Sequence, residues 1–138
     1  MKLEKKKLIV KREYKEVYKC EDGIVKIEKD HPKADVFNEA LNTARVEATG
    51  LDIPCVKEVS QVDGKWAILI EYKEGTTLEE MMEADPGNLE KYMEDFVDLQ
   101  LEMHSKKAAR LNKLKDKLSA QINGLKELDA TTRYELLT

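Results

Sequence analysis

The sequence has few of the features that mark disulfide-rich, zinc-binding or membrane-spanning proteins. Its two cysteines, Cys20 and Cys55, lie in unrelated segments without the close spacing of metal ligands, so neither a disulfide framework nor a zinc site is expected. The longest uninterrupted apolar run, Trp66 to Ile70, is far shorter than the roughly 20 residues that cross a bilayer. No apolar stretch follows the lysine-rich start, so no signal peptide is expected. We therefore expect a cytoplasmic protein without membrane contact.

An excess of positive charge is also missing. The 138 residues include 24 Lys and Arg against 28 Asp and Glu, which gives a net charge of −4 at pH 7. Proteins that bind nucleic acid neutralise phosphates with Lys and Arg gathered on one face. The charge balance therefore argues against nucleic acid as the main partner. The length fits one domain, or one small lobe with a helical extension.

Up to about residue 75 the sequence predicts three strands, a helix and two strands. The first strands are expected at 7–10, 16–20 and 24–27, with Asp22-Gly23 as a type I′ turn because both residues tolerate positive φ. A helix should run from about Pro32 to Thr49 and stop at Gly50. Strands 56–59 and 65–72 should form a hairpin around Asp63-Gly64. The buried stripe of the helix is predicted at Phe37, Ala40, Leu41, Ala44 and Ala48.

After Gly75 the sequence predicts helices. Thr77 and Glu80 have the spacing of a capping box, and Pro86-Gly87 should break the short helix that follows. Asn88 should cap a longer helix with apolar positions Leu89, Tyr92, Met93, Phe96, Leu99 and Met103, and a third should carry Leu111, Leu114, Leu118, Ile122 and Leu125. We therefore expect two parts, residues 1–75 and 76–138.

Several short motifs follow one another along the chain. They are Ile24-Val25-Lys26-Ile27, then Gly50-Leu-Asp-Ile-Pro-Cys-Val56, Asp63-Gly64, Glu71-Tyr-Lys-Glu-Gly-Thr-Thr-Leu78 and His104 at the end of the long helix. From about Lys7 to His104 the chain resembles aminoglycoside phosphotransferases and choline kinases. The resemblance implies an α+β fold: a protein-kinase-like amino-terminal lobe, with a five-stranded antiparallel sheet and one helix, followed by helices of an incomplete carboxy-terminal lobe.

The resemblance also implies roles for single residues. Lys26 would reach the α- and β-phosphates of ATP, and Glu39 would pair with it and hold it extended. Ile70 would lie behind the adenine, while the Glu71 C=O and the Lys73 N–H would bond its edge. The ring would be covered by Val10, Val17 and Ile24. Each residue also has a plainer interpretation: Lys26 and Glu39 as solvated surface charges, and the apolar residues as ordinary core.

Two family features do not occur in the sequence. Lys11-Arg-Glu-Tyr-Lys-Glu16 stands where many kinases have a glycine-rich phosphate loop, and Lys11, Arg12 and Lys15 could supply charge there. No H-G-D-x-x-x-x-N run, which would carry the catalytic Asp and a magnesium ligand, is present. We therefore expect a fragment that binds ATP but does not itself transfer phosphate. In the full-length protein, ATP with Mg²⁺ would phosphorylate a small-molecule hydroxyl; no metal ligand is identified in this chain.

Two other function classes remain open from the sequence. One is a pseudokinase-like module that binds a nucleotide or a protein without turnover. The other is a helical interaction domain that uses the helices between Asn88 and Leu125. Without further carboxy-terminal residues, Leu111, Leu114, Leu118 and Ile122 would be exposed, and large exposed apolar patches tend to find partners. We therefore also expect self-association through these helices.

Overall fold

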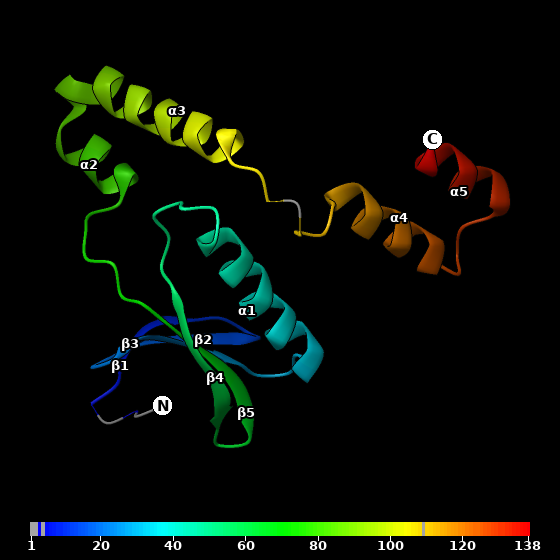
Figure 1. Ribbon diagram of the computed structural model, residues 1–138, viewed down its shortest axis with the longest axis horizontal. Coiled ribbons are helices and arrows are strands. Elements are labelled where there is room, and N and C mark those ends of the chain that lie inside the picture. Colours follow the sequence, from blue (N-terminus) through cyan, green and yellow to red (C-terminus); the bar gives the residue numbers. More distant parts are fainter. Residues whose placement is uncertain (1–2, 4, 109) are drawn as a thin grey trace. The chain divides into compact units, whose positions relative to one another are not determined.

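The computed structural model describes residues 3, 5–108 and 110–138 (Figure 1). Contacts divide the chain into two compact units, residues 1–108 and 109–138, and each unit is described by itself. The boundary that the sequence predicts after residue 75 would separate the two lobes of a kinase, and it stays a prediction. Within the described residues, no helix combines the length and the apolar character that a bilayer crossing needs.

The first unit is built on a five-stranded antiparallel sheet with the strand order β1-β2-β3-β5-β4. The strands are β1 (Lys7–Lys11), β2 (Lys15–Cys20), β3 (Gly23–Glu28), β4 (Val56–Val62) and β5 (Lys65–Ile70). Helix α1 (Lys33–Glu47) connects β3 to β4 and packs on β4 and β5. The predicted α+β class, with five antiparallel strands and one helix after the third, is confirmed.

The two hairpin turns differ from each other. Asp63 and Gly64 have φ angles of 50° and 77°, as the predicted turn requires, and they join the paired residues Val62 and Lys65. The turn predicted at Asp22-Gly23 is wrong by one residue, because Cys20 pairs with Gly23 and the loop is Glu21-Asp22, where neither residue has a positive φ.

Gly23 is instead required inside the strand. Its φ is 145°, and a Cβ at this position would collide with the backbone carbonyl oxygen of Ile70 on β5. The glycine therefore allows the backbones of β3 and β5 to approach closely. Close approach of another backbone is a common reason for glycine inside a strand.

The predicted buried stripe of α1 is wrong in all but one position. Val36 and Ala40 are buried against the sheet, whereas Phe37 and Leu41 are 44% and 48% exposed. The helix is therefore turned by about one residue from the expected orientation. Ala44 and Ala48 are also exposed.

Polar contacts and one aromatic contact account for this orientation. Phe37 lies at the flank of the helix, where its ring meets the ring of Trp66 edge-on with centroids 5.3 Å apart. Glu47 faces the sheet, and its Oε1 accepts a 2.6 Å hydrogen bond from the N–H of Val56 at the start of β4. A pattern that counts only apolar residues cannot predict that a carboxylate of the helix faces the sheet and accepts a hydrogen bond from the neighbouring strand.

The two faces of the sheet bury separate apolar clusters. Between α1 and the sheet lie Val36 and Ala40 of the helix and Ile68 of β5, with Val56, Val59, Trp66 and Ile70 packed against them. On the opposite face lie Cys20, Val25, Ile27, Val62, Ala67 and Leu69, with Leu3 and Tyr18 against them. Because side chains alternate along a strand, β4 and β5 contribute to both clusters.

The helices after the sheet begin largely where the sequence predicts. In α2 (Leu78–Ala84) the capping box is confirmed: the Glu80 N–H donates to the Thr77 hydroxyl at 3.2 Å and the Thr77 N–H donates to the Glu80 carboxylate at 3.0 Å. A 3-10 turn (Pro86–Asn88) leads into α3 (Leu89–Ser105). The second unit consists of α4 (Leu114–Gly124) and α5 (Ala130–Leu137). Leu111 was predicted to lie in a helix, but it precedes the start of α4.

Candidate functional site

Lys26 lies in β3, the central strand of the sheet, on the face that α1 partly covers. Its partners across the strands are Val17 on β2 and Ile68 on β5, and directly opposed residues of antiparallel strands point to the same face. Ile68 is buried beneath α1. Val25 and Ile27 point to the other face and are buried there, which is the alternation predicted for this strand.

Lys26 pairs with Glu39 on α1. The Nζ of Lys26 lies 3.3 Å from Oε1 of Glu39. Glu39 precedes Ala40, which is buried against the sheet, so the packing of α1 brings the carboxylate to the edge of the strand. The two side chains are 31% and 38% exposed. The pair predicted from the sequence is therefore a contact in the structure.

A second lysine, Lys15 on β2, also approaches this carboxylate. Its Nζ lies 3.7 Å from Oε2 of Glu39 and 2.7 Å from Oε1 of Glu28. Glu28 is only 3% exposed, and its Oε2 lies 3.0 Å from Nδ1 of His31. The contacts of Glu28 are ion contacts by distance, since neither has the angular geometry of a hydrogen bond.

The two carboxylates keep Lys15 protonated. Partial burial alone would lower the pKa of Lys15, but the carboxylates of Glu28 and Glu39 outweigh that effect and the pKa is raised above its ordinary value. Lys15 and Lys26 therefore place two positive charges on one face of the sheet. Cross-strand register puts Lys15 opposite Glu28 and Lys26 opposite Val17.

A small cavity of about 70 Å³ lies beside these charges. It is lined by Lys15, Glu28, His31, Asp35, Val36 and Glu39. One water occupies about 30 Å³ of liquid, so this space suits about two waters and excludes a nucleotide. Within the described part of the chain, no three His, Cys, Asp or Glu side chains are grouped as a metal site would need. A larger ligand near Lys26 would have to lie on the open part of the sheet.

That open part carries the four apolar residues predicted to cover an adenine. Val10 pairs with Val17, and Ile24 pairs with Ile70, while Val17 is also the partner of Lys26. The register therefore places all four on the face of Lys26, and we call them the apolar shelf. Val17, Ile24 and Ile70 are half-buried, and Val10 is 37% exposed. The shelf ends at α1, because Ile70 packs against the cluster beneath that helix.

Glu71 and Lys73 follow the shelf along the chain. The Glu71 N–H donates to the Cys55 C=O at 2.8 Å, and this bond fixes the segment after β5 to the segment before β4. The Nζ of Lys73 lies 2.7 Å from Oδ1 of Asp52 and 3.4 Å from Glu71, and the bond to Asp52 raises the pKa of Lys73. Among the hydrogen bonds of the described residues, the Glu71 C=O and the Lys73 N–H take no part. Both main-chain groups can therefore pair with a ligand.

The sequence interpretation missed the contacts of the buried Glu28 with Lys15 and with His31. The signal for the contact with Lys15 was the hairpin register, because a loop at Glu21-Asp22 places Lys15 directly opposite Glu28. The predicted loop at Asp22-Gly23 would have paired Lys15 with Asp30 instead. The one-residue error in the turn therefore concealed the buried carboxylate, since a slip in register moves every pair along the strand.

No protein-family model matches the chain, and no curated protein matches it. The assignment of a function therefore depends on the geometry of the shelf and the charges beside it.

Proposed function

We propose that the apolar shelf and Lys26 bind a nucleoside triphosphate, and that the chain is the nucleotide-holding part of a small-molecule phosphotransferase similar to aminoglycoside phosphotransferases and choline kinases. The observation that carries the proposal is the contact of Lys26 with Glu39 beside the four apolar residues of the shelf on the same face. A planar base would lie on the shelf, and its edge would bond the Glu71 C=O and the Lys73 N–H.

The charges support a phosphate at the edge of the shelf next to α1. A lysine acts on phosphate as a point charge, and Glu39 holds Lys26 in place. Lys15 approaches the same carboxylate and also lies close to Glu28. The second lysine supplies charge at the position where other nucleotide sites use glycine-rich backbone. Mg²⁺ would arrive with the triphosphate, and its protein ligands are not assigned to residues of this chain.

The transfer step is likewise not assigned to this chain. Phosphoryl transfer to a hydroxyl needs a residue that positions the hydroxyl, commonly the Asp of an H-G-D-x-x-x-x-N loop, and no such run occurs in the 138 residues. The proposed activity of the chain is nucleotide binding. Transfer to a small hydroxyl compound would need a residue of that kind in addition to the nucleotide site.

Calorimetric titration of the chain with Mg·ATP and with adenosine tests the proposal. Lys26→Met should weaken ATP binding about tenfold or more and leave adenosine binding unchanged, because Lys26 contacts phosphate alone. Ile24→Asp should weaken the binding of both ATP and adenosine, because it places a charge on the shelf. Lys65→Met, at the exposed start of β5, is the matched control and should behave as the wild type.

Two results would contradict the proposal. One is the absence of saturable ATP binding at millimolar concentration in the wild type. The other is equal ATP affinity in Lys26→Met and Lys65→Met. Binding without any hydrolysis or transfer, in a longer protein that has the H-G-D loop, would instead favour the non-catalytic nucleotide module.

A further inference from the structure

Helices α2 and α3 carry an apolar groove that no described residue fills. The groove has a volume of about 410 Å³ and is lined by Leu78, Glu79, Met82, Glu83, Met93 and Phe96. Met93 and Phe96 remain 46% and 41% exposed. Further along α3, Leu99, Leu101 and Met103 are more than half exposed. An apolar surface of this extent marks an interaction site.

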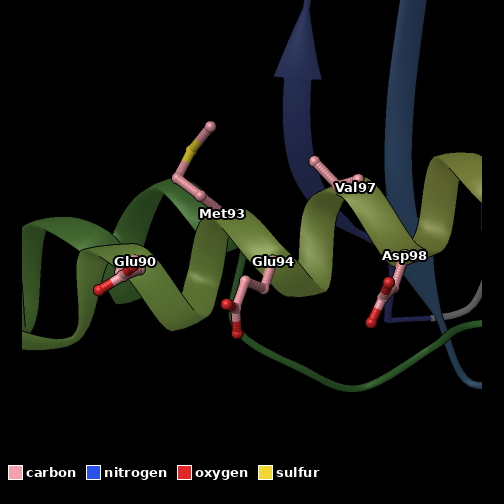
Figure 2. Close-up of a pocket in the computed structure, with 5 residues that line it drawn as sticks. All are labelled: Glu90, Met93, Glu94, Val97 and Asp98. Carbon is pink, nitrogen blue, oxygen red and sulfur yellow. The ribbon is translucent and has the colours of Figure 1, made fainter.

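The surroundings of the groove are strongly acidic. Residues 78–105 contain nine Asp and Glu and a single lysine, Lys91. Figure 2 shows apolar and acidic side chains on different sides of α3: Met93 and Val97 project from one side of the helix, and Glu94 and Asp98 project from the other. A partner that covers the groove must therefore be apolar on one side and positively charged beside it.

The groove is also rich in methionine. Four of the five methionines of the chain, Met81, Met82, Met93 and Met103, lie in α2 and α3. Methionine side chains are flexible and polarizable, so a methionine-lined groove adapts to the apolar face of a helix. The combination of methionines and carboxylates therefore favours a basic amphipathic helix as the occupant.

The chain itself contains an amphipathic helix, α4, within a basic segment. Residues 106–126 contain seven Lys and Arg against one Asp, and of these Lys115, Asp116 and Lys117 lie in α4 itself. Within them, α4 carries Leu114, Leu118 and Ile122 one turn apart, and Leu114 and Leu118 are 69% and 48% exposed. The charge of this segment is opposite to that of α2 and α3.

The position of the lysines in α4 is a second indication. Lys113 is the N-cap residue, and Lys115 and Lys117 lie in the first turns of the helix. The helix dipole disfavours cations at an N-terminus, so these lysines do not stabilise α4 on its own. An acidic partner surface would offset that cost.

We propose that α4 of one copy of this protein docks in the α2–α3 groove of a second copy, with Leu114 and Leu118 against Met82, Met93 and Phe96. The lysines at the start of α4 then face the carboxylates Glu79 and Glu83. Each copy carries one groove and one α4, so two copies can make the contact reciprocally in a twofold dimer.

Two double variants and their mixture test the dimer by ultracentrifugation. Met82→Gln with Met93→Gln removes the apolar groove at nearly constant volume, and Leu114→Gln with Leu118→Gln removes the apolar face of α4. Each should raise the dimer Kd at least about tenfold, since buried apolar anchors carry most interface energy. Mixed together, the two variants should form a heterodimer, because the intact α4 of one meets the intact groove of the other.

Controls separate the groove from general effects. Met81→Gln with Met103→Gln changes the two methionines of α2 and α3 outside the groove and should leave the Kd unchanged. If a groove variant loses its helical circular dichroism, Glu79→Lys with Glu83→Lys replaces it, because both side chains are exposed. This charge reversal should also dissociate the dimer, and Lys115→Glu with Lys117→Glu in the mixing partner should restore it.

Three results would overturn the proposal. They are a wild-type protein that is monomeric at every concentration, a groove variant that remains dimeric, and a mixture of the two double variants that forms no complex. Pairing of α4 with α4 predicts the second and third of these results, so the experiment distinguishes it from docking in the groove.

Discussion

The Nζ of Lys26 on β3 lies 3.3 Å from Oε1 of Glu39 on α1, across the contact between the sheet and its one covering helix. Both side chains are about one-third exposed, and ion pairs at such positions contribute only about 0–1 kcal/mol to stability. Stability alone is therefore a weak reason for placing a lysine in the central strand beside the apolar shelf. A ligand that needs a held positive charge is a better one.

A double-mutant cycle on Lys26→Met and Glu39→Gln should therefore give a small coupling energy. We expect about 0.5 kcal/mol in urea unfolding, since the pair is partly solvated. The same two substitutions should each reduce ATP affinity. A coupling above about 2 kcal/mol would show that the pair is a structural contact and would weaken the functional interpretation of Lys26.

Gly23→Ala should destabilise the protein by about 2–4 kcal/mol, because a Cβ would collide with the Ile70 carbonyl at a φ that favours glycine. Gly75→Ala is the control, since a Cβ there meets no atom within 4 Å. Thermal unfolding of both variants measures the difference. A wild-type melting temperature in Gly23→Ala would mean that β3 and β5 are further apart than described.

Lys15→Met should lower the free energy of unfolding by about 1–3 kcal/mol, because it leaves the buried Glu28 carboxylate without its lysine. Lys15 is one-third exposed, so the loss is smaller than for a fully buried pair. Lys15→Met combined with Glu28→Leu should recover much of the loss, since both polar groups are then removed. Lys11→Met, whose lysine is 66% exposed, should change stability little. Urea midpoints at neutral pH measure all three.

The two thiols should react at different rates in the native protein. The pKa of both thiols is raised: that of Cys20 by burial, and that of Cys55 by desolvation and by the nearby Glu47 and Glu71 carboxylates. The two differ in access, because Cys20 is 7% exposed and Cys55 is exposed. Only thiolate attacks a disulfide reagent, so Cys55 alone should give a fast phase, and its rate should keep rising above pH 8.5. Cys55→Ser should abolish that phase and Cys20→Ser should not; two slow thiols would contradict the structure.

Helix α5 should depend on pH through its N-cap, Asp129. Hydrogen bonds from Thr132 and Thr131 to this carboxylate hold its pKa below the ordinary value. A lowered folded pKa means that the cap stabilises the helix above the unfolded pKa of about 3.9 and that this contribution is lost as the pH falls through the folded value. Carbon-13 shifts of residues 130–137 should therefore differ between the wild type and Asp129→Ala at neutral pH and converge in acid. Asp129→Asn, which caps without ionising, should show a weaker pH dependence.

Local sequence signals predicted the elements well. The Asp63-Gly64 turn, the capping box of Thr77 and Glu80, and the start of α1 at Pro32 are all short-range features, and the structure has each of them. Their physics involves one residue's φ or one hydrogen bond a few residues away, so the neighbouring sequence is sufficient to predict them. The alternation that turns Val25 and Ile27 away from Lys26 is local in the same sense.

What required the tertiary structure was the orientation of elements toward each other. The apolar pattern of α1 predicted Phe37 and Leu41 inside, but Glu39 and Glu47 face the sheet because Lys26 and the Val56 N–H are there to receive them. Gly23 was interpreted as a turn residue, but the approach of β5 gives it its role. The sequence by itself determined the strands, the Asp63-Gly64 turn and the presence of Lys26 and Glu39. Only the tertiary structure decided that those two side chains meet, because their separation depends on the strand register and the rotation of a helix, which distant residues set.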